Sequence, residues 1–452
     1  MNFAQEYSRK LHTAEEAALC VKPGDWVDYG LGTNYPELLD RALAARKEEL
    51  YDIRIRGGLV IHPEIAVVEA DRERDVFMYN SWHFVAYERK LHDANLCNYI
   101  PMTFRYLPHF YRKHIPVDVA FLAVSRMDDH GYFSCGLSCT AYKAVAEAAK
   151  TLVLEVNERY PFSRTAEGHA IHISEADMIV EGAHREPPEL PGKEPSPAER
   201  EIGRRIVAEI ENGAVLQLGI GALPEMVGNL IAESDLRDLG CHTEMLSDSY
   251  LRLYRDGKLT NNSKGAHKGK SLFALALGTK DLYEWLDRNP EACGYSVDYI
   301  NDPVNIAAND KMISVNSAVS LDLYGQTCAE SAGTRNISGT GGQLDFLTGA
   351  FYSKGGKGFI CLTSTYKQHN GDGSFHVRSR IVPTMGCGDI VTDPRSQAFY
   401  IATEYGIVNL AGLSTWERAE KIISIAHPDF REELIKNAEE QKIWRKSNRT
   451  PF

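Results

Sequence analysis

The chain has 452 residues, 43% of them hydrophobic, which is enough to bury a large core and predicts two or three domains. Its 62 acidic residues exceed its 50 basic residues, and the net charge of -12 is not gathered into long blocks of one sign. This composition argues against binding to nucleic acid or to an anionic membrane surface, but a local pocket for a small anion remains compatible with it.

The N-terminal segment is charged and has no apolar signal-peptide core, and the chain has no apolar run of membrane-spanning length. Its nine cysteines include no C-x-x-C pair and lack the spacing of a zinc site. We therefore expect reduced thiols, no metal, and a cytoplasmic protein that is neither exported nor inserted in a membrane.

Two stretches of the chain repeat one pattern, in which a short apolar strand passes through a G-x-G turn into a helix with an early proline. The strands are predicted at 26–29 and 215–218. The equivalent positions are Gly30 and Gly219, Gly32 and Gly221, Pro36 and Pro224, and Asp52 and Asp238. The repeat predicts a duplicated unit of parallel strands joined by helices.

A proline-rich, charged segment separates the two copies and predicts an extended linker at 187–200. It divides the chain into an N-terminal α/β domain at 1–186 and a C-terminal α/β domain at 201–452. Further apolar runs without alternation suit strands that are buried on both faces, as in a parallel sheet. They lie at 118–124, 151–156, 177–182, 312–319, 358–365, 389–393 and 398–406.

The glycine turn of the second copy is the first candidate site. Gly219 and Gly221 allow close approach of a ligand, and the helix near Pro224 points free amides into the same space, which suits an anion or an oxyanion. A dinucleotide site is the competing interpretation. It is weakened because Pro224 replaces the third glycine, and because Gly58 stands opposite Glu244 in the first copy.

A second candidate is the glycine-dense stretch ISGTGGQLDF at 337–346, which predicts a loop folded closely around something, with an ordinary tight turn as the alternative. Lys354, Lys357 and Lys367 follow it and could meet phosphate, although lysines usually face solvent. A surface hairpin is predicted around 370–373.

Glu244 follows the second-copy strand and is predicted to lie at the carboxyl end of the sheet, where ligands collect. The common alternative for a glutamate is a solvated or ion-paired surface group. A carboxylate in this place could act as a base or as a nucleophile, and spacing alone leaves both open.

The motifs GIGALP, HTEM, SAVSLDLYGQ, AESAG, SGTGGQLDF, SRIVP and TEYGIVNLAGLSTWERAEKIISIAHPDFREEL occur in this order. With them the chain resembles the class I coenzyme A-transferases, in the acetyl-CoA hydrolase/transferase branch that includes butyryl-CoA:acetate and 4-hydroxybutyrate CoA-transferases. The resemblance spans nearly the whole chain, and the ending IWRKSNR is most like the butyryl-CoA:acetate members. It implies two similar α/β domains with mainly parallel sheets and an active site in the cleft between them.

The resemblance also implies residue roles. Glu244 would be the nucleophile that carries a glutamyl-CoA thioester in a ping-pong exchange between an acyl-CoA and a short carboxylate. The residues implied to contact CoA are Gly219, Ile220, Gly221, Ala222, Leu223, Val319, Gly342 and Lys367. CoA enters as a thioester substrate, no cofactor stays bound, and a homodimer or homotetramer is expected.

The acyl group is less determined. Butyryl-CoA and acetate are the expected pair, and 4-hydroxybutyrate, propionate or succinate are alternatives. A hydrolase acting through the same residues and a catalytically inactive CoA-binding protein also remain open. The aromatic stretch with Trp82, His83, Phe84 and Tyr87 could line a short acyl pocket or belong to the core.

Overall fold

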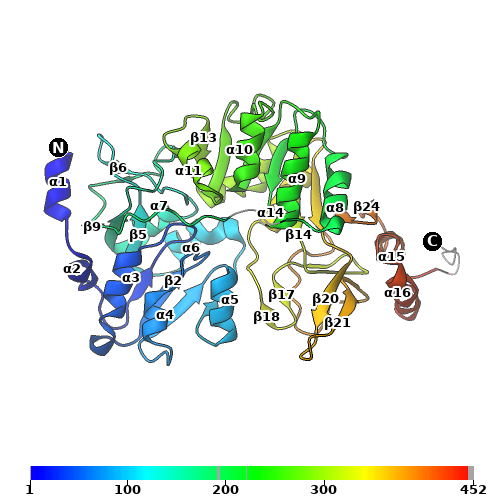
Figure 1. The fold of residues 1–452 in the computed structure, drawn as a ribbon, viewed down its shortest axis with the longest axis horizontal. Coiled ribbons are helices and arrows are strands. Elements are labelled where there is room, and N and C mark those ends of the chain that lie inside the picture. Colours follow the sequence, from blue (N-terminus) through cyan, green and yellow to red (C-terminus); the bar gives the residue numbers. More distant parts are fainter. Residues whose placement is uncertain (1, 191–193, 220, 446–452) are drawn as a thin grey trace.

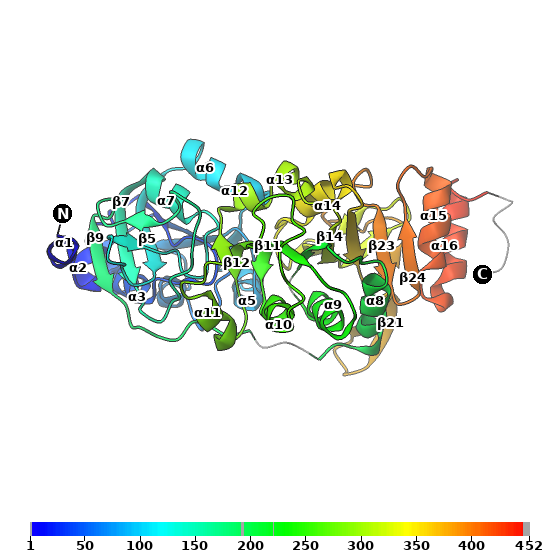
Figure 2. The same ribbon diagram turned by 90° about the horizontal axis from the view of Figure 1, so that it is seen from above.

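The computed structural model describes residues 2–190, 194–219 and 221–445. Two α/β halves lie along the long axis of the molecule, with the N-terminal helices α1 and α2 at one end and the C-terminal helices α15 and α16 at the other (Figures 1 and 2). The mixed α/β class and its mainly parallel sheets agree with the sequence prediction.

The first half is built on a seven-stranded parallel sheet with the order β4-β3-β2-β1-β5-β7-β9. Its strands are β1 Trp26–Asp28, β2 Ile53–Gly57, β3 Phe77–Ser81, β4 Asn98–Tyr99, β5 Val117–Val124, β7 Ala149–Val156 and β9 Met178–Glu181. Its helices are α1 Phe3–Lys10, α2 Ala14–Ala18, α3 Glu37–Ala44, α4 Ala66–Ala70, α5 Ala86–Asp93, α6 Leu107–Lys113 and α7 Tyr142–Ala148, and β6 Tyr132–Phe133 pairs with β8 Ile171–His172 outside the sheet.

The second half repeats that order as β13-β12-β11-β10-β14-β19-β23, and adds the antiparallel edge strand β24. Its strands are β10 Val215–Leu218, β11 Gly240–Leu246, β12 Ser271–Ala276, β13 Ala292–Gly294, β14 Met312–Ser317, β19 Lys357–Cys361, β23 Tyr400–Thr403 and β24 Gly406–Asn409. Its helices are α8 Pro197–Val207, α9 Ala222–Glu233, α10 Asp248–Arg255, α11 Lys280–Leu286, α12 Val297–Ile300, α13 Pro303–Ala307, α14 Gln343–Tyr352, α15 Thr415–Ser424 and α16 Pro428–Glu440.

Smaller strands extend from the second half on one side. They are β15 Ser320–Asp322 with β16 Thr327–Cys328 and β22 Ile381–Val382, β17 Ser331–Ala332 with β18 Arg335–Asn336, and β20 Thr365–His369 with β21 Phe375–Ser379. The last pair is the surface hairpin predicted around 370–373, and its strands are largely exposed.

The local backbone confirms the duplication at two of the predicted residue pairs. Gly32 and Gly221 have φ angles of +120° and +121°, a region that favours glycine. Asp52 and Asp238, which each precede the second strand of a copy, both have a left-handed φ, of 52° and 59°. These turns tolerate few residue types, so the same types recur at equivalent positions.

Strand register then identifies the first-half counterpart of Glu244. Trp26 pairs with Arg54 in the first sheet, and Val215 pairs with Gly240 in the second. Four residues beyond each partner stand Gly58 and Glu244. At this position of the strand, therefore, only the second copy has a carboxylate.

The two halves share a hydrophobic core that contains residues of both, among them Leu31 and Leu59 from the first and Met245 and Phe346 from the second. The first-half segment around Ser138 reaches across to β12, where Cys139 N donates to Ala274 O at 2.8 Å. Burial of side chains from both halves in one core holds the halves together. The surfaces that face each other then form the walls of the space between the halves.

One predicted boundary and one predicted strand differ in the structure. Helix α8 begins at Pro197, inside the segment predicted as linker, because Ser196 and Glu199 form a capping box. The strand predicted at 389–393 is wrong. Asp393 makes only an isolated bridge to Thr327, and Ile390 and Val391 are exposed, so the apolar run belongs to a surface loop.

Within residues 2–190, 194–219 and 221–445, no helix is both long and apolar enough to cross a membrane.

Candidate active site

A cavity of about 1140 Å³ lies between the two halves, and both contribute to its walls. The first half provides Leu59 and His83, which follow β2 and β3. The second half provides the ends of β10, β11 and β14, with Glu244 on β11. The cavity thus opens at the carboxyl ends of parallel strands from both sheets, as the sequence predicted for Glu244.

Two donors hold the Glu244 carboxylate. Asn301 Nδ2 donates to Glu244 Oε2 at 2.6 Å, and the backbone N–H of Gly342 donates to the same carboxylate. Gly342 is the N-cap of α14, so the positive end of that helix also faces the carboxylate. The donors fix the position of the side chain without forming an ion pair with it.

Burial raises the pKa of Glu244 to about 7, although the hydrogen bonds from Asn301 and Gly342 lower it. A carboxylate with this pKa is a stronger base and nucleophile than an exposed glutamate, and a substantial fraction of it is ionised at neutral pH. The alternative interpretation of Glu244 as a solvated or ion-paired surface group is therefore wrong.

The glycine-dense loop is the structure that closes over Glu244. A β-carbon on Gly342 would lie 2.1 Å from Glu244 Oε2 and 2.0 Å from Asn301 Nδ2, so only glycine fits. The loop is fixed to the first half, because Phe104 N donates to Gly341 O at 3.2 Å and Arg89 donates to Ile337 O at 2.7 Å. The close packing predicted for this loop is packing against the carboxylate.

Asn301 is itself held by its neighbours. It is fully buried at the end of α12, where the ring of His242 contacts Ile300 O at 2.8 Å. Burial lowers the pKa of His242 to about 3, so this ring is neutral. Strand β11 therefore carries Glu244, and through His242 it also holds Ile300, the residue before Asn301.

A second acid lies behind the carboxylate. Asp345, in the first turn of α14, forms an ion pair of 2.6 Å with Arg105 from the first half. Burial and the charge of Glu244 raise the pKa of Asp345 to about 7, while Arg105 lowers it. Arg105 thus ties α14 to the first half next to the site.

The predicted CoA-contact residues are only partly brought together. Gly219, Gly221, Ala222 and Gly342 line the cavity, while Leu223 is buried in the core of the second half and Ile220 lies outside the described residues. The turn rests on a buried network in which Asn316 and Gln217 exchange hydrogen bonds.

Val319 and Lys367 lie elsewhere. Val319 bonds through its backbone to Cys328 and Arg380, and Lys367 lies on the exposed hairpin with its Nζ 4.5 Å from the centre of the Phe375 ring. Neither residue lines the cavity.

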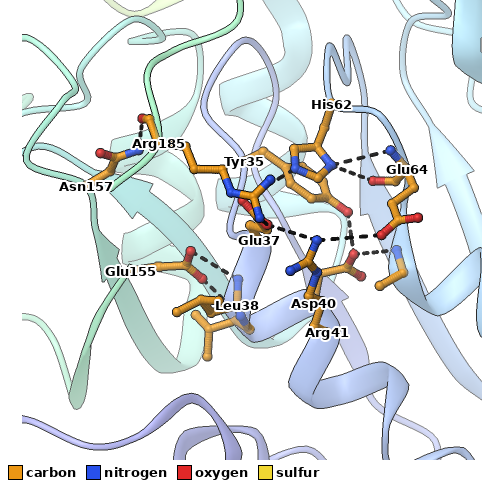
Figure 3. Close-up of polar contacts among 12 residues, drawn as sticks. Tyr35, Glu37, Leu38, Asp40, Arg41, His62, Glu64, Glu155, Asn157 and Arg185 are labelled. Atoms are coloured by element: carbon orange, nitrogen blue, oxygen red, sulfur yellow. Dashed lines mark hydrogen bonds and ion pairs between the residues drawn. The ribbon is translucent and has the colours of Figure 1, made fainter. Parts of the chain in front are cut away.

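The far end of the cavity is polar and belongs to the first half. Glu37 forms ion pairs of 3.0 Å with both Arg41 and Arg185, and Tyr35 donates to Asp40 nearby, at 2.6 Å (Figure 3). Ion-paired and hydrogen-bonded side chains thus surround this end of the cavity, which could accommodate polar parts of a long ligand.

The first-half copy of the glycine turn is already occupied. The carboxylate of Glu155 accepts from Leu38 N and Leu39 N at 3.1 and 2.9 Å, at the N-terminus of α3 (Figure 3). The Glu155 carboxylate thus caps the N-terminus of α3, and Gly58 stands where the second copy has Glu244. These features of the first copy agree with a single candidate centre in the second copy.

The aromatic stretch divides between the two predicted environments. Trp82 is buried and donates to the Tyr111 hydroxyl at 3.1 Å, whereas His83, Phe84 and Tyr87 line the cavity. Sequence reasoning missed Asn301 and Arg105, which carry no recognisable motif, and gave no role to Asp345, although Asp345 lies within the stretch ISGTGGQLDF. No group of three or more potential metal-ligating residues is present in the described part of the chain.

Comparison with known proteins gives family matches in both halves. The family model of the acetyl-CoA hydrolase/transferase N-terminal domain matches residues 1–188, and that of the C-terminal domain matches residues 278–438.

Similar proteins match over nearly their full length. A butyryl-CoA:acetate CoA-transferase of Anaerostipes caccae is 47% identical over 99% of this chain and 100% of its own. A 4-hydroxybutyrate coenzyme A transferase of Clostridium kluyveri is 38% identical over 96% of this chain and 98% of its own. The crystal structure of RipA from Yersinia pestis is 35% identical and superposes with a TM-score of 0.88, covering 98% of this chain and 100% of that one.

Proposed function

Because the chain belongs to the acetyl-CoA hydrolase/transferase family, we propose that it moves CoA between a short-chain acyl-CoA and a short carboxylic acid. The observation that carries the proposal is the Glu244 carboxylate, with Oε2 held by Asn301 and with its pKa raised to about 7 in a cavity between the halves. Butyryl-CoA and acetate are the proposed pair, supported by the relative that is 47% identical.

The proposed exchange begins when Glu244 attacks the thioester carbonyl. The first tetrahedral intermediate expels CoA thiolate and leaves an acyl-glutamyl anhydride. The thiolate then attacks the glutamyl carbonyl, which releases the first acid as a carboxylate and leaves a glutamyl-CoA thioester. A second carboxylate reverses both steps, so ping-pong kinetics follow.

The surroundings of Glu244 suit these steps. Asn301 binds Oε2, and Oε1 borders the open space at Gly341, so Oε1 is the proposed attacking oxygen. Charge then develops on oxygens close to the N-termini of α14 and α9, whose amides can stabilise an oxyanion by about 3 kcal/mol per donor. Exchange of a thioester between two carboxylates is nearly thermoneutral, so the proposed reaction requires no ATP.

The long CoA chain is proposed to lie along the turn at 219–223 and across Gly342. Close approach is possible because Gly221 has no contact within 4 Å at its β-carbon position. Val319 and Lys367 are proposed contacts from the family resemblance alone. Binding energy from this remote part of the substrate would orient the thioester against Glu244.

The same resemblance supports a homodimer or homotetramer as the proposed assembly. The nine cysteines are free thiols, in keeping with the cytoplasm as the proposed location.

The experiment that tests the proposed function measures consumption of butyryl-CoA and release of free CoA with and without a carboxylate. Acetate, propionate, butyrate, 4-hydroxybutyrate and succinate are compared as acceptors. A transferase consumes the acyl-CoA only with an acceptor and releases little free CoA. Equal release with and without acceptor would instead identify a hydrolase, and no turnover with any acid would contradict the proposal.

A further inference from the structure

An open space separates His83 of the first half from Glu244 of the second. The position that a β-carbon on Gly341 would take lies 3.7 Å from His83 Cε1 and 4.0 Å from Glu244 Oε1. Both side chains therefore border one small volume, which stays open because Gly341 has no side chain. The Glu244 oxygen that faces it is the one not bonded to Asn301.

His83 is held firmly in this place. Its backbone N–H donates to Ser81 Oγ at 3.3 Å, and its carbonyl accepts from Leu59 N at 3.0 Å. Ser81 Oγ in turn donates to Glu88 at 2.6 Å, and Glu88 also accepts from Val60 N at 3.3 Å. The loops after β2 and β3 are thereby tied together beneath the imidazole.

The glycine loop packs against one edge of the imidazole. A β-carbon on Gly339 would lie 2.8 Å from His83 Nδ1, so this position too requires glycine. The loop therefore approaches His83 at Gly339 and Glu244 at Gly342, and it leaves the gap between them at Gly341. One loop thus sets the separation of the two groups.

The His83 ring carries no hydrogen bond from another side chain or backbone group in the part of the chain that the structure describes. Burial, with the nearby charge of Arg89, lowers the pKa of His83 to about 4. The ring is neutral at physiological pH, and a neutral imidazole offers one N–H donor and one acceptor. His83 lines the cavity, so this half-buried side chain can offer an unused donor there.

We propose that the imidazole of His83 binds the carboxylate substrate, donating a hydrogen bond to it in the space opposite Glu244. The inference rests on the proposed function, because it assigns the acid-binding position of that same reaction. One carboxylate oxygen accepts from His83, and the other faces the carbonyl carbon of glutamyl-CoA at Glu244. A neutral donor suits this role, since it orients the anion without forming an ion pair that would weaken its nucleophilicity.

The test uses the isolated glutamyl-CoA form of the protein, prepared with acyl-CoA and freed of excess substrate. Acetate is added over a range of concentrations, and the rate of acetyl-CoA formation is recorded for wild type, His83→Phe and His83→Gln. Hydroxylamine is added in a parallel series, because it attacks the same thioester without a carboxylate for His83 to bind. His109→Gln, at an exposed histidine on α6, is the matched control.

His83→Phe is expected to raise the acetate concentration needed for half-maximal rate by about 10- to 100-fold, because a hydrogen bond to a charged group is lost. His83→Gln keeps an N–H donor and should recover most of that loss. The rate with hydroxylamine should stay unchanged in both, and His109→Gln should match wild type throughout.

Two results would overturn the inference: an unchanged acetate dependence in His83→Phe, or equal losses with acetate and hydroxylamine, which would indicate a structural role. Failure of the wild type to form any glutamyl-CoA would instead overturn the proposed function, so the two failures are distinguishable.

Discussion

Replacing Gly342 by alanine tests the placement of Glu244 with the smallest possible change. The φ of Gly342 is -104°, which alanine adopts without strain, so the backbone tolerates the substitution. The added methyl would lie 2.1 Å from Glu244 Oε2 and 2.0 Å from Asn301 Nδ2. An ordinary carbon–oxygen contact is more than 3 Å, so the carboxylate or the loop must move by about 1 Å.

A displacement of about 1 Å at a reacting group lowers rates by about 100-fold. We therefore expect Gly342→Ala to lower kcat of CoA exchange and the single-turnover rate of glutamyl-CoA formation by about that factor. Both are measured with butyryl-CoA and acetate, and circular dichroism confirms that the variant is folded.

Gly371→Ala is the matched control, because Gly371 lies on the exposed hairpin with nothing within 4 Å of its β-carbon position. It should leave both rates unchanged. Wild-type rates in folded Gly342→Ala would refute the geometry assigned to Glu244.

Three further predictions concern Glu244, Asn301 and Glu155. The carboxyl of Glu244 has a pKa of about 7 and must lose its proton to attack. The value of kcat/KM for the acyl-CoA should therefore fall about tenfold per pH unit below pH 7. A flat profile between pH 5.5 and 8 would contradict this. Asn301→Ala should lower kcat by about 10- to 100-fold, because a hydrogen bond to the charged Glu244 is lost. Asn305→Ala is the control. Equal kinetics in the two variants would rule out a role for Asn301 in holding Glu244. Burial raises the pKa of Glu155 to about 7 from an ordinary 4.5, so the folded state binds this proton more tightly than the unfolded state. As pH rises from 4 to 8, the free energy of unfolding of wild type should therefore fall by about 3 kcal/mol relative to that of Glu155→Gln. A difference between the two proteins that does not depend on pH would contradict this.

The duplicated fold was predictable because it depends on local backbone chemistry. Gly32 and Gly221 adopt nearly the same positive φ, and Asp52 and Asp238 occupy matching left-handed turns. Few residues serve in such conformations, so the pattern is visible in one sequence. The strand expected at 389–393 failed because its apolar residues are exposed, and apolar runs do not show on their own what they pack against.

The candidate site was predictable only in part. Strand order and the glycine turn placed Glu244 at the cleft, and family resemblance gave it a role. Asn301 is 57 residues away in sequence and follows a short helix without a motif. Arg105 comes from the other half of the duplication and meets Asp345 only through the packing of the two halves. Contacts of this kind depend on tertiary structure, so local spacing does not reveal them.

Covalent attachment of CoA to Glu244 changes the intact mass of the protein, so mass spectrometry detects the proposed intermediate directly. Wild type and Glu244→Gln are incubated with butyryl-CoA, freed of unbound ligand under denaturing conditions, and weighed. We expect a CoA-sized increase in the mass of wild type that acetate removes, and no increase in Glu244→Gln. Wild type without a CoA-sized adduct, or an equal adduct in Glu244→Gln, would contradict it.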